Sequence, residues 1–465
     1  MKKTVVLNVV GLTPRLIGRD TPFIQKFVQR GKSTIIEPVL PAVTCSVQST
    51  YLTGKWPETH GVVGNGWYFK DELEVKFWRQ SNRLVESPKI WDELKKQDPE
   101  FTCANMFWWY NMYSTADYSV TPRPNYLADG RKLPDIYSFP AGLRDELQEE
   151  LGTFPLFDFW GPRTSIKSSK WIADASILTD KKYDPTLTLV YLPHLDYNLQ
   201  RYGHDMEKIA SDLQEIDAVV EELVTYYERK NANVILLSEY GITDVSNPVH
   251  VNRILRENGW LAIREERGLE LLDAGASKAF AVADHQVCHV YLNDPKIKNA
   301  VISALRKTTG IKEIMGKHDQ QLNHISHERS GDLVLVSDEN SWFTYYFWLD
   351  DSKAPDFARI VDIHKKPGYD PVEMFTDPGK PFIMARVLWK LFKKKLGFRV
   401  LMDVIPLDAK LVKGSHGRIP ESKLDYPVLV SNVKDGAAGE SVSGVEVYDI
   451  IKQHITNSKI HETIL

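Results

Sequence analysis

Short apolar runs alternate with amphipathic segments along most of this chain, and this alternation is the feature that most constrains its fold. The segments Thr4–Val10, Thr186–Leu192 and Asn233–Ser238 are rich in Val, Leu and Ile, as buried strands are. Residues 206–230 instead place apolar side chains on one face of a long helix. Strands that alternate with helices predict an α/β fold with a central mixed, mostly parallel sheet between helix layers.

The same patterns predict further elements along the chain. Additional strands are expected at Ser33–Val39, Phe101–Phe107, Val287–Leu292, Leu333–Ser337 and Val428–Ser431. Additional helices are expected at residues 22–30, 88–96, 295–307 and 445–455.

Composition excludes several classes of protein. The chain has 465 residues, of which 43% are hydrophobic and 26% charged, so it can bury a large core and is not a disordered chain. A net charge of −4 without a long basic run argues against nucleic acid as a partner. Cys45, Cys103 and Cys288 form neither a disulfide framework nor a CxxC metal motif. We therefore expect a cytoplasmic protein, and no apolar stretch is long enough to predict a transmembrane segment.

Two aromatic-rich regions interrupt the alternation. Residues 66–171 contain many Trp, Tyr and Pro residues, and residues 341–410 are also aromatic and include a basic helix at Ala385–Lys395. We interpret both as insertions in a single domain over residues 1–465, the second of them as an insertion or lid. Loops of this kind build pockets or lids, or only pack against one another.

A candidate nucleophile follows the second predicted strand. Thr44 begins a short predicted helix that Gly54 ends. One interpretation is that the Thr44 hydroxyl caps the helix. The other is a nucleophilic hydroxyl at a helix N-terminus, where free N–H groups and the helix dipole favour an anionic phosphate. Helix placement does not separate the two.

The next residues carry a resemblance to a known family. Residues 53–65 read TGKWPETHGVVGN, which closely resembles the pattern TG-x-x-P-x-x-HG-(I/V)-x-x-N of type I phosphodiesterases and nucleotide pyrophosphatases, a branch of the alkaline phosphatase superfamily. In that family a threonine at this spacing before the pattern attacks phosphorus, and the final asparagine donates a hydrogen bond to the phosphate oxygens. The resemblance implies these catalytic roles for Thr44 and Asn65.

The resemblance extends to part of a metal site. Asp196 follows a predicted strand as the first metal-site aspartate of the family does. His416 lies in a Gly-Ser-His-Gly stretch that matches the Gly-x-His-Gly of the family, and Glu239 replaces an aspartate in its Ser-Asp-His-Gly stretch. The resemblance therefore implies that Asp196, Glu239 and His416 are metal ligands.

Three other ligand positions of the family differ in this chain. Val10, Gln200 and Tyr240 stand where the family has Asp, His and His. His285 and His364 are candidates to replace lost ligands, although each is equally compatible with a structural role beside a strand. Two divalent ions about 4 Å apart neutralise a phosphodiester and activate the attacking hydroxyl. Because Zn²⁺ prefers His nitrogen and carboxylate oxygen, we expect one or two Zn²⁺ or similar divalent ions.

Together these features predict a fold and a function. The resemblance implies an alkaline-phosphatase-like α/β/α sandwich and a metal-dependent hydrolase of phosphodiester, pyrophosphate or phosphomonoester substrates that acts through a phospho-threonine intermediate. Similar proteins are encoded beside prenyltransferase and sugar-phosphate cyclase genes in bacterial Ebo-type clusters, which implies a small cyclitol- or prenyl-linked phosphate as substrate. The alternative is a non-catalytic binding or scaffold descendant with a degenerate metal site. Metal content of the purified protein separates the two.

Overall fold

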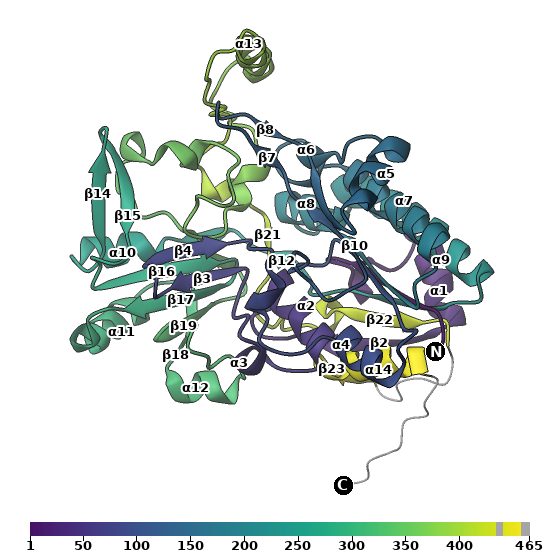
Figure 1. Cartoon of the computed structure of the whole chain (residues 1–465). Coiled ribbons are helices and arrows are strands. Elements are labelled where there is room, and N and C mark those ends of the chain that lie inside the picture. The colour runs from purple at the N-terminus through teal and green to yellow at the C-terminus, as the bar shows by residue number, and fades with distance from the viewer. Residues whose placement is uncertain (434–439, 457–465) are drawn as a thin grey trace.

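A mixed sheet of nine strands runs through the centre of the protein (Figure 1). The computed structural model describes residues 1–433 and 440–456. The central strand β1 (Thr4–Val9) pairs in parallel with both β10 (Leu187–Leu192) and β11 (Asn233–Leu237). The strands follow the order β23 (Ser441–Ser443), β2 (Lys32–Glu37), β22 (Val428–Ser431), β11, β1, β10, β5 (Cys103–Met106), β6 (Tyr118–Pro122) and β9 (Ile136–Phe139).

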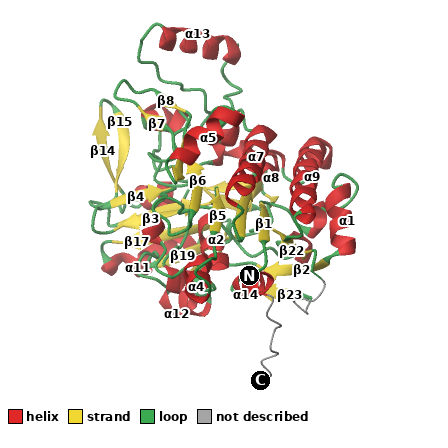
Figure 2. Cartoon of the chain, turned by 45° about the vertical axis from the view of Figure 1, so that its right-hand side comes forward, coloured by secondary structure: helices red, strands yellow, loops and turns green. Residues whose placement is uncertain are grey.

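Helices cover both faces of this sheet (Figure 2), which confirms the predicted sandwich of helix layers around a mixed sheet. The long helix α9 packs against α1, α7 and α8 on one face, whereas α14 packs against α2 on the other. The first layer consists of α1 (Pro22–Arg30), α5 (Gly142–Leu151), α7 (Ile166–Tyr183), α8 (His194–Tyr202) and α9 (Met206–Arg229). The second layer consists of α2 (Thr44–Thr53), α4 (Ile90–Gln97) and α14 (Glu446–Thr456).

A smaller antiparallel sheet of four strands lies beside the central sheet and has a hydrophobic core of its own. Its strands follow the order β16 (Ala279–Asp284), β17 (Val287–Leu292), β19 (Leu333–Ser337) and β18 (Ile311–Met315). Helices α10 (Val251–Glu257) and α11 (Lys298–Arg306) contact this sheet, as does α12 (Lys317–Leu322). Hairpin β3–β4 (Gly66–Phe69 and Glu74–Phe77) packs on β16, whereas β14–β15 (Ala262–Glu266 and Leu269–Asp273) projects from the body (Figure 1).

The strands and helices expected from the sequence are present, with bounds that differ by a few residues at most in nearly every case. The predicted strands Val287–Leu292, Leu333–Ser337 and Val428–Ser431 have the same bounds in the structure. The first two, however, belong to the antiparallel second sheet rather than to the central one. A fully apolar run looks the same in a buried parallel or antiparallel strand, so the pattern predicts the strands but not their sheet.

The two predicted insertions differ in structure. Within residues 66–171, the strands β5, β6 and β9 form one edge of the central sheet. Residues 341–410 contain short 3₁₀ turns and the helix α13 (Ile383–Lys395), and many of their aromatic side chains join the core of the second sheet. The division of residues 1–465 into one domain with these insertions stays a prediction, and its C-terminal end lies outside the described residues. No helix in the described ranges is long and apolar enough to cross a membrane.

Candidate active site

Polar side chains gather where the three central strands end. Asn8 lies near the end of β1, Asp196 lies in the first turn of α8 after β10, and Glu239 follows β11 by two residues. All three side chains are buried. Because these strands are neighbours and parallel, their carboxyl ends bring the three groups to one edge of the sheet, where ligands of open α/β sheets bind.

Thr44 is the first residue of α2, and its hydroxyl does not cap that helix. Val43 occupies the N-cap position. Thr44 Oγ1 instead lies 3.1 Å from the phenol oxygen of Tyr240. That phenol donates a hydrogen bond to Asp196 Oδ1 at 3.3 Å. Of the two interpretations left open by the sequence, this geometry favours a hydroxyl held in the site over a helix cap.

Asn65 reaches the same helix end from the loop after α3 (Pro57–His60). Its Oδ1 accepts a hydrogen bond from the backbone N–H of Cys45 at 3.0 Å, so Asn65 satisfies a free donor of α2 beside Thr44. Its side-chain nitrogen donates to Asp284 Oδ1 at 3.1 Å, and its backbone N–H donates to Asp284 Oδ2 at 2.7 Å. Asp284 thereby fixes the orientation of the amide. The second N–H of the Asn65 side chain makes no hydrogen bond with the described residues.

Four aromatic rings form a continuous stack in the site. The ring of His416 lies between those of Tyr240 and His285, with centroid distances of 3.6 and 3.7 Å. The ring of Tyr369 stacks on the other face of His285 at 3.6 Å. The stack brings two of the predicted ligands, His285 and His416, side by side, although they are far apart in the sequence.

Both histidines present an unshared electron pair on Nε2. His416 Nδ1 donates to the backbone oxygen of Ala42 at 2.7 Å, since a carbonyl can only accept. His285 Nδ1 donates to Asp284 Oδ1 at 2.8 Å. Burial lowers the pKa of both imidazoles well below the usual value, so both are neutral. Each Nε2 is buried and has no hydrogen-bond partner.

Asp196 is held by neutral donors at two positions where the related family has histidines. Gln200 Nε2 donates to Asp196 Oδ2 at 2.9 Å, and the Tyr240 phenol donates to Oδ1. Tyr369 in turn orients Gln200 by donating to its Oε1 at 2.9 Å. Burial raises the pKa of Asp196 to about 7, against the effect of these hydrogen bonds.

Glu239 is held in a similar way by two amides. Asn8 and Gln48 each donate to Glu239 Oε1 at 2.5 Å, and Oε2 has no partner. Burial raises the pKa of Glu239 to about 8, opposed by hydrogen bonds from Gln48, Asn8 and the Thr44 hydroxyl. The sequence analysis did not identify Gln48 or Asp284. Two positions in the sequence could have indicated them. Gln48 lies one helical turn after Thr44, and Asp284 directly precedes His285.

The side chains around His416 have the chemistry of ligands for one metal ion, although their ligand atoms do not all lie within 4.8 Å of one another. His285 and His416 offer imidazole nitrogens, and Asp196 Oδ1 lies 3.9 Å from His416 Nε2. These are ligand types that Zn²⁺ prefers. The other ring nitrogen of each histidine donates to a carboxylate or a carbonyl, as is typical of metal-bound histidines. His285 thus lies where it can compensate for Gln200.

The side chains around Glu239 fit a second ion poorly. Val10 is apolar, and the phenol proton of Tyr240 is directed at Asp196. One oxygen of Glu239 already accepts two amide hydrogen bonds. A second cation would have to displace these donors, so the structure argues against the two-ion arrangement that the family resemblance implies.

Two other histidines lie elsewhere. His364 Nδ1 is 3.4 Å from the backbone oxygen of Phe77, its ring contacts Tyr126, and none of its recorded contacts is with another predicted ligand. His194 belongs to the only group of three metal-binding residue types, among the described residues, whose ligand atoms all lie within 4.8 Å of one another. Its other members, Asp212 and Glu215, lie on α9, and none of the three was predicted.

Aromatic side chains of both predicted insertions adjoin the ring stack. Trp78 lies next to Trp109, with ring centroids 4.9 Å apart, and both belong to residues 66–171. Trp78 and Trp160 also contact Tyr369, at 6.1 and 5.8 Å. Trp108, in contrast, is fully buried in the core of the central sheet. Trp78, Trp109, Trp160 and Tyr369 form what we call the aromatic wall of the site.

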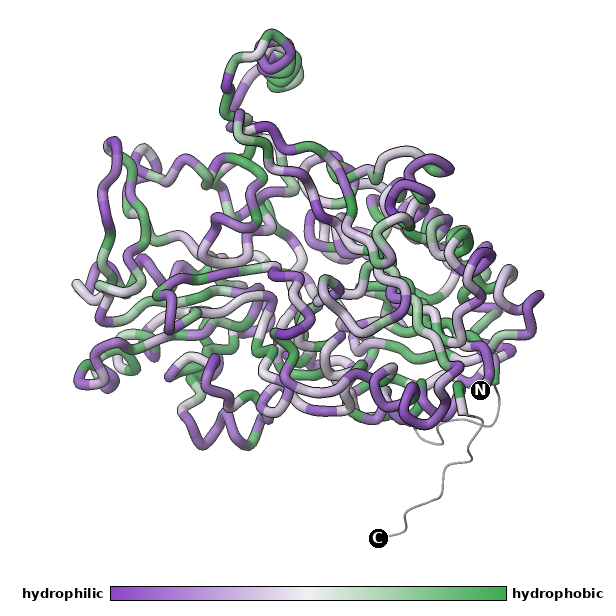
Figure 3. The backbone as a smooth tube through the Cα atoms, in the orientation of Figure 1, coloured by the Kyte–Doolittle hydropathy of each residue, from purple (hydrophilic) through white to green (hydrophobic). Residues whose placement is uncertain are grey.

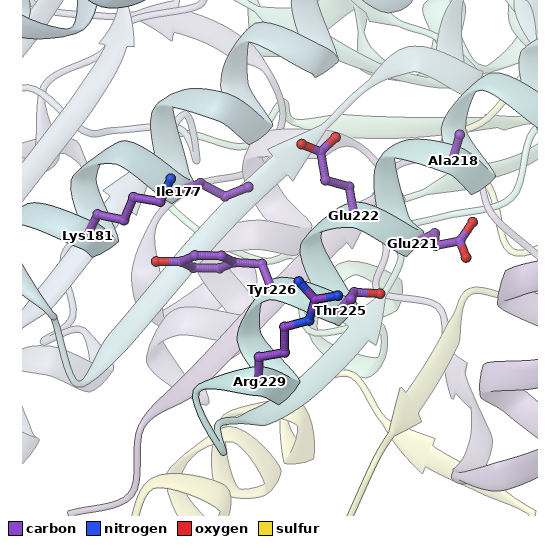
Figure 4. Close-up of a pocket in the computed structure, with 8 residues that line it drawn as sticks. All are labelled: Ile177, Lys181, Ala218, Glu221, Glu222, Thr225, Tyr226 and Arg229. Atoms are coloured by element: carbon purple, nitrogen blue, oxygen red, sulfur yellow. The ribbon is translucent and has the colours of Figure 1, made fainter.

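A surface groove elsewhere contains none of the site residues. It lies between α7 and α9, and Figure 4 shows the side chains of both helices around it, among them Tyr226, Glu222 and Arg229. Its lining has no nucleophile beside a base and no pair of imidazoles. We therefore place the candidate chemistry at the strand ends and not in this groove.

His60, from the family-like segment, supports the loop that carries Asn65. Its Nε2 donates to Thr50 Oγ1 at 3.0 Å, because that hydroxyl donates its own proton to Ser46. Its Nδ1 accepts from the backbone N–H of Val62 at 3.1 Å. Burial lowers the pKa of His60 from 6.5 to about 3. A protonated His60 would lose the Val62 hydrogen bond and bury an unpaired charge.

This arrangement predicts acid sensitivity that His60→Gln reduces. Between the folded and unfolded pKa values the unfolded chain binds more protons, so the free energy of unfolding falls as pH drops below 6.5. His60 alone should contribute a loss of about 2 kcal/mol between about pH 7 and pH 5. The glutamine amide can make both hydrogen bonds without titrating. Urea unfolding at both pH values should therefore show a smaller loss for His60→Gln, and equal losses would contradict the assignment.

Comparisons with known proteins show the family to which the chain belongs. The sequence model of the family described as Type I phosphodiesterase / nucleotide pyrophosphatase matches residues 4–370. An uncharacterized pyrophosphatase/phosphodiesterase of Schizosaccharomyces pombe is 26% identical in an alignment that covers 52% of this chain and 45% of that protein. Ectonucleotide pyrophosphatase/phosphodiesterase 1 of Saccharomyces cerevisiae is 23% identical in an alignment that covers 53% of this chain and 35% of that protein. The match thus spans less than half the length of each relative.

Solved structures share the fold. Murine ectonucleotide pyrophosphatase/phosphodiesterase 5, in an inactive form with AMP, superposes with a TM-score of 0.60 at 13% identity and covers 99% of this chain and 96% of its own. Phosphonoacetate hydrolase from Sinorhizobium meliloti, in complex with phosphonoacetate, gives a TM-score of 0.62 at 13% identity, with 98% and 95% covered. At this identity the likeness shows the fold alone, which is the alkaline-phosphatase-like fold expected from the sequence.

Proposed function

Because the chain belongs to the type I phosphodiesterase / nucleotide pyrophosphatase family, we propose that it hydrolyses small phosphate esters or pyrophosphates through a phosphorylated Thr44. The observation that carries the proposal is the Thr44 hydroxyl at the start of α2. It is not used as a helix cap, and Asn65 lies beside it on the same helix end. The helix N-terminus favours the negative charge of a bound phosphate.

In the proposed reaction, Glu239 takes the proton of the attacking hydroxyl. Thr44 Oγ1 attacks phosphorus, and its proton passes to the Glu239 carboxylate. The P–O bond to the leaving group breaks, and the leaving oxygen departs with that electron pair and takes a proton from water. A base with a pKa of about 8 is well matched to proton transfer near neutral pH. The free N–H of Asn65 then stabilises the charge on the phosphate oxygens. Water subsequently releases phosphate from Thr44.

We further propose that Asp196, His285 and His416 hold one divalent ion, with Zn²⁺ as the best match to two imidazoles and a carboxylate. Such an ion, when bound, supplies positive charge to the substrate phosphate. The orphaned Nε2 atoms of the two histidines support this assignment. The Zn²⁺ identity and the number of ions are part of the proposal.

The aromatic wall supports a substrate with a ring or an apolar group. Stacking on Trp78 or Tyr369 suits a flat or apolar moiety attached to the phosphate, worth about 0.5–1.5 kcal/mol for each favourable ring pair. A cyclitol-linked or prenyl-linked phosphate remains the proposed substrate. A cytoplasmic location, expected from cysteine usage, is likewise a proposal.

Metal content and turnover together test the function. The purified protein, supplied with Zn²⁺, should bind about one equivalent and hydrolyse members of a panel of phosphate monoesters, diesters and pyrophosphates. Asp196→Ala, His285→Ala and His416→Ala should each lose the ion. His364→Ala is the matched control, because it removes a half-buried histidine that contacts no other predicted ligand, and it should keep the ion. If only His364→Ala lost the metal, His364 would be a metal ligand and the other three residues would not.

A non-catalytic binding protein is the second candidate. It is favoured by one specific observation: amide and phenol donors already satisfy Asp196 and one oxygen of Glu239 without a cation. This candidate predicts no bound metal after refolding with Zn²⁺ and no turnover of any panel member. It also predicts that phosphate esters still bind. The same experiment therefore decides between the two.

A further inference from the structure

Helix α13 stands apart from the body of the protein. Figures 1 and 2 show it at the end of two extended connections, away from both sheets. None of its thirteen residues is buried. A helix of a soluble domain normally turns its apolar face to the core, so an isolated helix of this kind needs another explanation.

Most of the apolar side chains of α13 are exposed to solvent. Ile383 and Val387 are half-buried and pack against the core of the second sheet. At about 100° per residue, Met384, Leu388 and Phe392 lie on another side of the helix. Trp389 and Leu391 flank them. Leu388 is 63% exposed, Trp389 57% and Phe392 50%, and the exposed apolar series continues to Phe398 after the helix.

The same segment is strongly basic. Residues 378–402 contain no Asp or Glu, and their cations are Lys380, Arg386, Lys390, Lys393, Lys394, Lys395 and Arg399. Of these, Lys390 is paired with Asp403 and Lys380 with Asp377 and Asp403, two carboxylates that lie just outside the segment. Figure 3 shows hydrophilic and hydrophobic residues side by side along this helix. The outward face is thus apolar with a basic border, in a chain whose net charge is −4.

We propose that α13 is a surface anchor that lies in the headgroup region of a bilayer containing anionic lipid. Helices that lie in a membrane interface carry Trp, Phe and Leu on one face and Lys and Arg on the other. The cations match the negative surface of such a bilayer. With thirteen residues the helix is about 20 Å long, too short to span the hydrocarbon core, so it lies in the membrane plane. This anchor does not depend on the proposed hydrolysis.

The positive charge of the α13 segment favours an anionic bilayer over a second copy of this chain as the binding partner. A second copy of this chain would place one dense group of cations against another, which costs energy. An anionic bilayer accepts the apolar face and the cations at once. Residues 341–410 also contain Tyr369 of the aromatic wall, so the anchor and the site share one segment of chain.

Vesicle flotation with the full chain tests the anchor. Wild-type protein should float with phosphatidylcholine vesicles that contain phosphatidylglycerol, and much less with pure phosphatidylcholine. Leu388→Asp/Phe392→Asp and Lys393→Glu/Lys394→Glu should each weaken partitioning by about tenfold or more. Leu322→Asp/Leu424→Asp is the matched control, since those side chains are 67% and 53% exposed on other elements, and it should float like wild type. High salt should weaken the binding of wild type.

Other outcomes overturn the proposal. Because none of the substituted side chains is buried, all variants should keep the melting temperature of wild type. Absence of wild-type flotation on anionic vesicles would contradict the anchor, as would equal flotation of the α13 variants. A dimer that Leu388→Asp/Phe392→Asp abolishes, in a protein that does not float, would assign the face to a second copy instead.

Discussion

Replacing Thr44 by alanine is expected to lower kcat by at least ~10³-fold, a rise of about 4 kcal/mol in the activation barrier. The reason is that Thr44 Oγ1 is the proposed attacking atom, and the neighbouring hydroxyl of Tyr240 is committed to Asp196. Substrate affinity should change little, because Asn65 and the helix N-terminus are kept. The measurement is steady-state kinetics on the best substrate of the panel.

Thr44→Ser is the matched control for this prediction. Serine keeps a nucleophilic oxygen in the same place, so it should retain much of the activity that alanine loses. Since Val43 and not Thr44 holds the N-cap position, Thr44→Ala should also leave the melting temperature nearly unchanged. A destabilised alanine variant with normal kcat per folded molecule would instead indicate a structural hydroxyl.

Asn65→Ala is expected to lower kcat by ~10²–10³-fold. Its free N–H is the proposed donor to the phosphate oxygens, whose charge grows in the transition state. The same substitution removes the acceptor for the backbone N–H of Cys45, at a cost of about 1 kcal/mol of stability. Kinetics per folded molecule and thermal unfolding separate these effects. If only stability falls, Asn65 is a helix cap and not a catalytic residue.

Asp284→Asn tests independently how the side-chain amide of Asn65 is positioned. The substitution replaces one carboxylate oxygen by an N–H donor. Either the backbone N–H of Asn65 loses its acceptor at Oδ2, or the Asn65 side chain and His285 both lose theirs at Oδ1. As a positioning residue, Asp284 should affect kcat more than KM. A proportional change in both kinetic constants would contradict this role.

The central sheet and the helices that cover it can be predicted from local sequence patterns. The runs around β1, β10 and β11 are mostly apolar and rich in Val, Leu and Ile, and the long α9 has a clear apolar face, so each element is determined by its own residues. The second sheet was not predicted as a separate unit. Its strands β17 and β19 pair across a long connection, and nothing in either run specifies the partner.

The site residues likewise fall into those that a local sequence pattern predicts and those that only the fold brings together. Thr44 and Asn65 were found because a dense local pattern surrounds them. The proximity of His285 to His416 depends on how the loop around His416 packs on the turn between β16 and β17, where the Gln286 N–H donates to the backbone oxygen of His416, and no short pattern encodes this packing. Gln48 and Asp284 are identified only by the partners they orient. A loss of ligands at Gln200 and Tyr240 was visible in the sequence, whereas their use as donors to Asp196 was not.

Acid-quench trapping of the phosphorylated protein tests the phospho-threonine mechanism most directly. The full chain, with its metal, is mixed with the best substrate, quenched in acid and digested, and the peptide that contains Thr44 is analysed by mass spectrometry. We predict one phosphoryl group on Thr44 in wild type, one on the serine of Thr44→Ser, and none on this peptide in Thr44→Ala. Turnover of the substrate by Thr44→Ala within about tenfold of wild type, with no phosphorylated wild-type peptide, would contradict the account.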